Sequence, residues 1–411
     1  MTRHEAHGNV NRGSFQVPGF QAAAAASGMR YKNRLDCALV VSDTPAAAAG
    51  VFTRNRFCAA PVILCKEHLA ATRGAARAVL INAGIANACT GEEGLRRARL
   101  SAHHAASVLG IDPQQVLVAS TGVIGPQLRL EPLQSALSRL AADLRPEGWE
   151  DAAAAIMTTD TVPKTAWAQT ELGAIPITCG GMAKGSGMIA PDMATMLAFV
   201  ATDARVSPEV LRFWLGEAVS RSFNRITVDG DTSTNDTVLV LASGTAAHPP
   251  ITDPDSSEAR AFGRVLSDVC LDLAHQIVRD GEGATKFVAV TVFGAKSRDR
   301  ALRVARTIAT SPLVKTALFG QDANWGRIVA AAGRAGVDFD PDRASLYFED
   351  VCIFRNGQPV QDEDLEEKAS AVFRRKDIRL RLDLGEGREE ETVYTCDFSY
   401  DYVKINADYR S

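Results

Sequence analysis

The apolar and polar positions along the 411-residue chain follow two alternating patterns. Short runs rich in valine and isoleucine, bounded by turn-forming residues, predict buried strands at 78–84, 116–122, 237–244 and 286–294. Between them, apolar residues recur at helical spacing. Ser207 and Pro208 form the N-cap and first turn of one predicted helix, and a second runs from about residue 259 to 279 and stops at Gly281. These elements predict a mixed α/β protein.

Three further segments carry other signals. The first fifteen residues are polar and are expected to form a disordered lead-in. Residues 246–259 are rich in Pro, Asp and Ser, which makes them the best candidate for a domain boundary or exposed linker. Residues 400–405, YDYVKI, have a strand-like pattern and are expected to anchor the C-terminus in a sheet.

Composition narrows the function classes. With 46% hydrophobic and 23% charged residues, the chain has the composition of a globular protein large enough for two domains. A net charge of −4 gives no basic surface for nucleic acid or an anionic membrane, and no apolar run is long enough to predict a membrane span. The eight cysteines are scattered without a C-x-x-C pair or zinc-type spacing, so we expect buried, reduced thiols. We therefore expect a cytoplasmic enzyme or binding protein with a small neutral or zwitterionic ligand.

The segment AKGSGMIAPDMATMLAF, residues 183–199, is glycine-rich but closes on apolar residues, unlike a solvated linker. It does not match the phosphate-binding P-loop pattern. A glycine turn with a solvated Lys184 is the simplest interpretation. Glycines also allow strained backbone conformations, which a peptide carbonyl needs if a neighbouring side chain is to attack it.

Thr195 is the candidate for such an attack. If its hydroxyl attacks the carbonyl of Ala194, the amide becomes an ester, and water then opens the ester to leave Thr195 as a new N-terminus. An α-amine has a reference pKa of about 7.7–8.0, so Thr195 would carry its own general base. The alternative is that Thr195 is a β-branched residue of a buried strand. A histidine-based triad is disfavoured because none of the seven histidines lies in a turn-flanked motif with Ser or Cys.

Residues 116–125 place Ser120, Thr121 and Gly122 after a predicted strand, at a turn. Backbone N–H groups at such a turn, with the Thr121 hydroxyl, are able to form an oxyanion hole. A strand that simply ends in turn residues explains the same pattern. Spacing alone leaves both interpretations open.

The segments 227–237 and 280–286 are dense in acidic and hydroxyl residues. The first lacks the spacing and terminal Glu of an EF-hand loop, so tight turns beside a site are favoured over metal ligands. Glu282 follows a predicted helix end and is placed to reach a substrate amine. Residues 319–328 predict a turn with Trp325 packed beneath it.

Ten of these and other motifs, in order along the chain, resemble those of the glutamate N-acetyltransferase family of arginine biosynthesis, also called ornithine acetyltransferase. The resemblance runs from residue 19 to the last residue. It is carried by AGVFTRN (49–55), ANACTG (86–91), STGVIG (120–125), IMTTDTVPK (156–164), KGSGMIAPDMATML (184–197), DGDTSTNDT (229–237), DGEGATK (280–286), SPLVKTA (311–317), NWGRI (324–328) and DYVKINADYRS (401–411).

The resemblance implies a layered α-β-β-α sandwich with a smaller C-terminal α/β portion. It also implies self-cleavage between Ala194 and Thr195 into an α chain (1–194) and a β chain (195–411), assembled as an α₂β₂ heterotetramer. Thr195 would then carry the acetyl group from N-acetylornithine to glutamate. No metal or cofactor is implied, and a role for acetyl-CoA as a second donor stays open. By the same resemblance, the oxyanion-hole positions are Thr121 and Gly122, and the substrate-binding positions are Thr158, Lys184, Thr195, Glu282, Asn406 and Ser411.

Four positions depart from the usual family pattern without touching those sites: Ala83, Ile85, Asp192 and Ala323. They bear on fine substrate preference. Three alternatives stay open at this point. The chain could be an N-terminal-nucleophile amidase or aminopeptidase that passes the acyl group to water, a specialised-metabolism paralogue with a related acyl donor, or a non-enzymatic protein with an intact chain.

Overall fold

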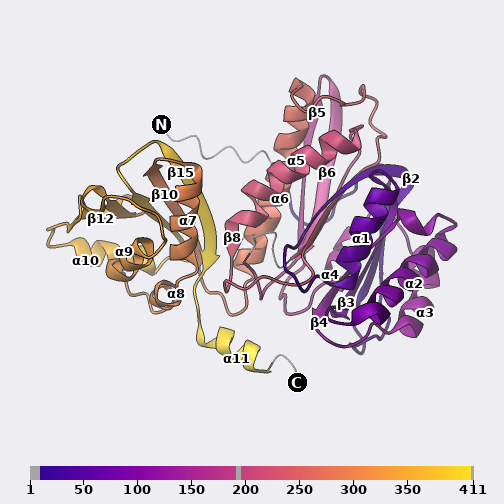
Figure 1. The fold of residues 1–411 in the computed structure, drawn as a ribbon, viewed down its shortest axis with the longest axis horizontal. Helices are drawn as coiled ribbons and strands as arrows, with labels where there is room; N and C mark the ends of the chain where they lie inside the picture. The colour runs from indigo at the N-terminus through magenta and orange to yellow at the C-terminus, as the bar shows by residue number, and fades with distance from the viewer. Residues whose placement is uncertain (1–9, 191–195, 409–411) are drawn as a thin grey trace. The chain divides into compact units, whose positions relative to one another are not determined.

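The computed structural model describes residues 10–190 and 196–408, which form two compact units (Figure 1). Unit 1 consists of the described residues within Met1–Asn224 and Asp231–Ile277, and unit 2 of those within Arg225–Gly230 and Val278–Ser411. The boundary predicted at 246–259 is wrong, because this loop belongs to unit 1. Its His248 is buried and accepts a hydrogen bond from the Arg205 N–H at 3.0 Å, and Ile251 pairs with Val206.

A mixed sheet forms the centre of unit 1, with strands in the order β4-β3-β2-β9-β7-β6-β5 and β1 paired with β2. The β3–β4 and β7–β9 pairs are parallel, and the other pairs are antiparallel. Three predicted strands are confirmed, in β3, β4 and β9. The strands are β1 (Phe20–Ala25), β2 (Cys37–Phe52), β3 (Ala75–Ile85), β4 (Val116–Val123), β5 (Lys164–Leu172), β6 (Ile175–Lys184), β7 (Leu197–Thr202) and β9 (Thr237–Ala242).

Helices α1 to α4 bury alanine-rich and leucine-rich faces in one core with this sheet. Helices α1, α2 and α3 lie together (Figure 1), with α1 and α2 in contact with β4, and α3 in contact with β1 and β2. Both predicted helices are confirmed: Ser207 caps α5 by accepting from the Val210 N–H at 3.3 Å, and α6 ends at Arg279. The helices are α1 (Ala60–Ala71), α2 (Gly91–Leu109), α3 (Leu130–Ala142), α4 (Trp149–Ala155), α5 (Pro208–Arg221) and α6 (Ser257–Arg279), with short 3₁₀ turns at Pro113–Gln115 and Phe223–Arg225.

The expected disordered lead-in is wrong for residues 11–15. Asn11 forms an antiparallel bridge with Trp167, and the Phe15 ring packs on Trp149 with centroids 5.0 Å apart. Burial of an aromatic ring offsets the entropy of ordering this segment, a gain that its polar composition does not reveal.

Unit 2 contains the smaller sheet, in the order β13-β12-β11-β14-β10-β15-β8, with α7 packed on β10 and β15. The strand predicted at 286–294 is confirmed as β10. The predicted α/β class and the smaller C-terminal α/β portion are also confirmed. The elements are β8 (Ile226–Thr227), β10 (Phe287–Ala295), α7 (Arg298–Ala309), α8 (Pro312–Phe319), α9 (Trp325–Gly333), a 3₁₀ turn (Pro341–Arg343), β11 (Ser345–Phe348), β12 (Val351–Arg355), β13 (Gln358–Pro359), α10 (Leu365–Phe373), β14 (Asp377–Asp383), β15 (Glu389–Cys396) and α11 (Tyr400–Asp408).

Two predictions in unit 2 are wrong. The segment 400–405 is not a strand but the start of α11, whose first turn is capped by Ser399 accepting from the Tyr402 N–H at 3.4 Å. Trp325 does not lie beneath a turn but opens α9, where Asn324 accepts from the Arg327 N–H at 3.2 Å. The turn itself, at residues 320–324, is present.

The cysteines are all free thiols, as expected, but Cys89 is exposed and Cys58 and Cys352 are only half-buried. Across residues 10–190 and 196–408, no helix has both the length and the apolar character needed to cross a membrane.

Candidate active site

Thr121 and Gly122 lie inside strand β4 rather than at a turn. The strand continues to Val123 because its parallel partner β3 also continues, pairing Gly84 with Gly122 and Ile85 with Val123. Gly122 has a φ of +127°, and a Cβ at this position would lie 2.2 Å from the carbonyl carbon of Gly84. Only glycine fits this close approach of two backbones, which leaves Thr121 as a largely buried side chain beside it.

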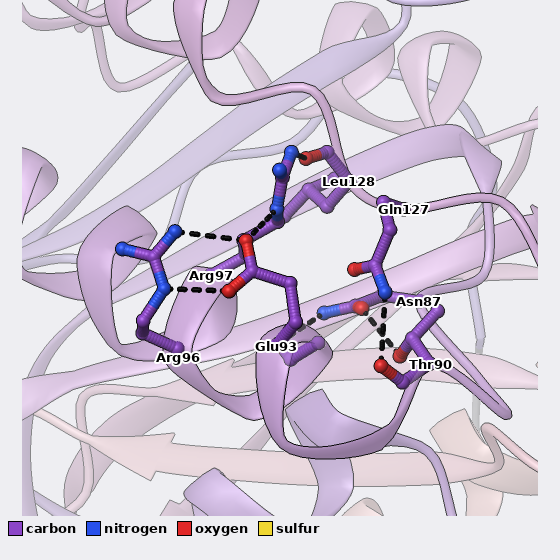
Figure 2. Close-up of polar contacts among 8 residues, drawn as sticks. Asn87, Thr90, Glu93, Arg96, Arg97, Gln127 and Leu128 are labelled. Carbon is purple, nitrogen blue, oxygen red and sulfur yellow. Dashed lines mark hydrogen bonds and ion pairs between the residues drawn. The ribbon is translucent and has the colours of Figure 1, made fainter.

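The loop that follows β4 is held against α2 by a group of polar contacts (Figure 2). Arg97 donates to the Leu128 carbonyl at 2.7 Å, and the Gln127 amide donates to the Thr90 carbonyl at 2.9 Å. Glu93 accepts from Arg97 at 2.6 Å and so fixes the guanidinium that reaches the loop. These contacts restrain the chain that leaves the predicted oxyanion strand.

The turn at 231–236 docks onto the ends of β3 and β4. The Asn235 amide donates to the carbonyls of Ala86 at 2.6 Å and Ser120 at 2.8 Å, and the Ser120 hydroxyl donates to Asn82 Oδ1 at 2.6 Å. The segment is therefore an irregular loop fixed against the two strands rather than the tight turn that the sequence predicted. Within the described ranges, no three His, Cys, Asp or Glu side chains are grouped as metal ligands would be.

The chain that follows the predicted cleavage point is held on both sides. In the sheet, Leu197 at the start of β7 pairs with Lys184 of β6 and with Thr237 of β9. Met196, one residue earlier, donates its N–H to Asp236 Oδ1 at 3.0 Å and accepts from the Thr237 N–H at 3.1 Å. Ala194 and Thr195 themselves lie outside the described residues.

Asp160 is the hydrogen-bonding centre of a second part of the site. Its buried carboxylate accepts from Lys164 Nζ and the Gly185 N–H, both at 2.7 Å, and from the Thr158 N–H at 3.0 Å. Lys184 Nζ lies 3.9 Å from the same carboxylate. Burial raises the pKa of Asp160, but the charges of Lys184 and Lys164 and the hydrogen bonds outweigh burial and hold the pKa well below its usual range.

Two predicted substrate-binding residues, Thr158 and Lys184, are thus brought together at one carboxylate. The simpler interpretation of Lys184 as a solvated side chain is wrong, because only 8% of the residue is exposed. Sequence reasoning missed Asp160 and Lys164. The available signal was an Asp and a Lys four residues apart in a segment otherwise made of small, hydroxyl and apolar residues.

In unit 2, Glu282 and Asn406 are in direct contact. The Asn406 amide, from α11, donates to Glu282 Oε2 at 2.8 Å, and Glu282 is buried in the loop after α6. Ser399 donates to the Gly283 carbonyl at 2.6 Å, and Asp397 accepts from the Thr285 N–H at 2.8 Å, so this loop is fixed by the segment before α11. Ser411 lies outside the described residues.

Comparison with known proteins gives a consistent picture. The ArgJ family matches residues 21–411. The arginine biosynthesis bifunctional protein ArgJ of Mesorhizobium japonicum is 48% identical over 399 residues, which is 96% of each chain. That of Symbiobacterium thermophilum is 50% identical, over 96% of this chain and 97% of its own. The crystal structure of the Bacillus halodurans protein is 41% identical with a TM-score of 0.50, and the match covers 52% of this chain and 99% of that one.

Proposed function

This chain belongs to the ArgJ family and is an ornithine acetyltransferase of arginine biosynthesis, and we propose that it transfers the acetyl group through an ester on Thr195. The observation that carries the proposal is the fixed chain directly after Thr195, where the N–H and the carbonyl of Met196 are both bonded to one neighbouring segment, at Asp236 and Thr237. A nucleophile joined to such an anchored residue is held in place without a histidine partner.

The chain first cuts itself between Ala194 and Thr195, which gives α (1–194) and β (195–411) chains and frees the Thr195 amine. This amine takes the hydroxyl proton as Thr195 Oγ attacks the acetyl carbonyl of N-acetylornithine. The Thr121 hydroxyl and the Gly122 N–H stabilise the oxyanion, ornithine leaves with the proton, and the glutamate amine then attacks the ester to give N-acetylglutamate.

The charged residues supply the two signs of charge that an amino-acid substrate requires. Lys184 supplies a positive charge for the α-carboxylate, and Thr158, held with it at Asp160, adds a hydroxyl. Glu282, bonded to Asn406, supplies a negative charge for an ammonium group. Ser411 adds its hydroxyl.

The proposed reaction needs no metal or cofactor, because every step is a proton transfer or an acyl transfer between groups of the protein and its substrates. Acetyl-CoA is a candidate second donor, since its thioester presents the same acetyl group to Thr195. We place the enzyme in the cytoplasm as an α₂β₂ heterotetramer.

Steady-state kinetics test the proposed route. With N-acetylornithine and glutamate both varied, an acetyl-enzyme predicts parallel double-reciprocal lines that a chelator does not change. Intersecting lines, or activity that a chelator removes and a metal restores, would contradict it. Release of acetate without glutamate would instead identify a hydrolase.

A further inference from the structure

Asp236 has a carboxyl group that the proposed acetyl transfer does not use. Only 3% of the residue is exposed, and it directly precedes β9. Oδ1 accepts from the Met196 N–H at 3.0 Å, and the backbone carbonyl accepts from the Thr53 N–H at 2.9 Å. In the part of the chain that the structure describes, Oδ2 is buried without a hydrogen-bond partner.

A buried carboxylate with an unsatisfied oxygen is costly, so this group is more stable as a neutral acid. Burial raises the pKa of Asp236 well above its usual range, although the hydrogen bond from Met196, the nearby hydroxyls of Thr53 and Ser233 and the charge of Lys184 act in the opposite direction. In the neutral form Oδ1 is the carbonyl oxygen that accepts from Met196, and Oδ2 carries a proton that it is able to donate.

We propose that Asp236 is the proton-transfer residue of self-cleavage at the Ala194–Thr195 bond. The inference rests on the proposed function, since it assumes that cut. The Met196 nitrogen is bonded to the carbonyl carbon of Thr195, and a single Cα joins that carbon to the nitrogen of the bond to be broken. The carboxyl is therefore anchored one residue from the reaction.

The step balances as follows. Thr195 Oγ forms a bond to the Ala194 carbonyl carbon, and the bond from that carbon to the Thr195 nitrogen breaks. Asp236 Oδ2 gives its proton to the departing nitrogen and takes up the proton released from Oγ, so the acid is restored. Water then hydrolyses the Ala194 ester and leaves the carboxylate of Ala194 and the hydroxyl and amine of Thr195.

The other buried carboxylate of this region is a poorer proton donor. Asp160 is held ionised by Lys164 and Lys184, and it already accepts hydrogen bonds from two backbone N–H groups. Burial favours the protonated form of Asp236, and the hydrogen bond from Met196 anchors its carboxyl beside the reacting bond.

Asp236→Asn tests the proposal, because the amide keeps the shape and the oxygen that accepts from Met196 but does not exchange a proton. Asp203→Asn is the matched control. Asp203 is also buried, accepts from a backbone N–H (Thr178, 2.7 Å), and has a pKa raised mainly by burial. It lies at the opposite end of β7 from Met196, about 20 Å away at roughly 3.3 Å per residue.

The chains are labelled in a short pulse of cell-free synthesis, and the fraction cut is followed by denaturing gel and intact mass. We expect Asp236→Asn to be cut at least about 100-fold more slowly than wild type, within the usual range for general acid–base catalysis, and Asp203→Asn to be cut at the wild-type rate. Hydroxylamine, which opens esters, should not cut folded Asp236→Asn, because the variant stops before the Ala194 ester forms.

Three results would overturn the inference. The first is cutting of Asp236→Asn at the wild-type rate, and the second is hydroxylamine cleavage of this variant at residue 194. The third is slow cutting of Asp236→Ala but not of Asp236→Asn, which would mean that the carboxyl only anchors Met196. If Asp236→Asn does not fold, Asp236→Glu takes its place, and a folded but uncut Glu variant would also overturn it. An uncut wild-type chain would instead refute the proposed function.

Discussion

Asp160 is the residue on which the Thr158 and Lys184 part of the site depends. It is fully buried with one negative charge facing two lysines, and its carboxylate also satisfies two backbone N–H groups. Removing one partner of a buried ion pair leaves an uncompensated charge, which costs far more than losing an exposed pair.

We therefore expect Asp160→Asn to lower the free energy of unfolding by about 3–5 kcal/mol, measured by urea denaturation. Glu217→Gln is the control, because it removes an exposed ion pair with Arg221 on α5 and should cost less than about 1 kcal/mol. Equal, small losses for both variants would show that the Asp160 cluster does not hold unit 1 together.

The pH dependence of this difference has a definite sign. The pKa of Asp160 is lower in the folded protein than in the unfolded chain, so its stabilising contribution is complete above about pH 4 and is lost as pH falls toward the folded pKa. The difference in unfolding free energy between wild type and Asp160→Asn should therefore shrink below pH 4. A difference that grows on acidification would contradict the assignment of an ionised Asp160.

Thr121 is predicted to act on the transition state rather than on substrate binding. Replacing its hydroxyl in Thr121→Val should lower kcat by about 100-fold, the usual range for one oxyanion donor, with little change in KM. Initial rates at varied N-acetylornithine measure both constants. An unchanged kcat with a raised KM would make Thr121 a contact to the bound substrate instead.

Among the elements, the β3–β4 pair depends on glycine facing glycine. An alanine at Gly122 would place its Cβ 2.2 Å from the Gly84 backbone at a φ of +127°. Gly122→Ala should therefore lose at least about 2 kcal/mol of stability, since backbone strain alone costs about 1–3 kcal/mol. Gly216→Ala, on the exposed face of α5 with open space around it, should instead gain up to about 1 kcal/mol in the same denaturation experiment. Two equal effects would contradict this account of the strand.

The C-terminal helix α11 carries Asn406 to Glu282, so it is expected to matter for transfer but not for self-cleavage. Deleting residues 406–411 should lower kcat/KM for acetyl transfer at least about tenfold, equivalent to roughly 1.4 kcal/mol, and leave the cut at residue 194 intact. Gel analysis and initial rates on one preparation measure both. A truncated protein with wild-type kcat/KM would show that residues 406–411 are dispensable for acetyl transfer.

The sequence predicts an element best where its pattern fits one period only. Strands β3, β4, β9 and β10 follow from valine-rich runs, and α6 from a periodic stripe that ends before Gly281. The apolar and polar positions of residues 400–405 fit both the period of a strand and the period of a helix. The deciding signal was Ser399 in the N-cap position.

The candidate site shows the same limit. Motif order predicts Thr121, Lys184 and Glu282 as site residues, but the partners that hold such residues come from strands and turns far apart in the chain. Asp160 contacts Gly185, and Asn235 contacts Ser120, through pairings that depend on the whole sheet. Local sequence spacing carries no information about such contacts.

On the scale of the whole molecule, the proposed cut falls between two neighbouring strands of one sheet. Strand β6 ends at Lys184 and β7 begins at Leu197, and the two are paired along their length. The α chain would supply β6 and the β chain β7 and β9, so their shared hydrogen bonds and buried side chains should keep the chains together after cleavage.

We therefore expect both chains to elute as one species in size-exclusion chromatography and to separate only in denaturant, with or without a reducing agent, because the cysteines are free thiols. Native mass spectrometry of the same fraction should give the mass of α₂β₂. An α chain that elutes alone under native conditions would contradict a sheet shared between the two chains.

The most direct test of the central claim is the intact mass of the purified protein before and after N-acetylornithine is added. We expect a β chain beginning at Thr195 that becomes heavier by one acetyl group, with the adduct on Thr195, and returns to its original mass when glutamate follows. A chain that transfers acetyl groups while remaining uncut, or a β chain whose mass never changes, would contradict it.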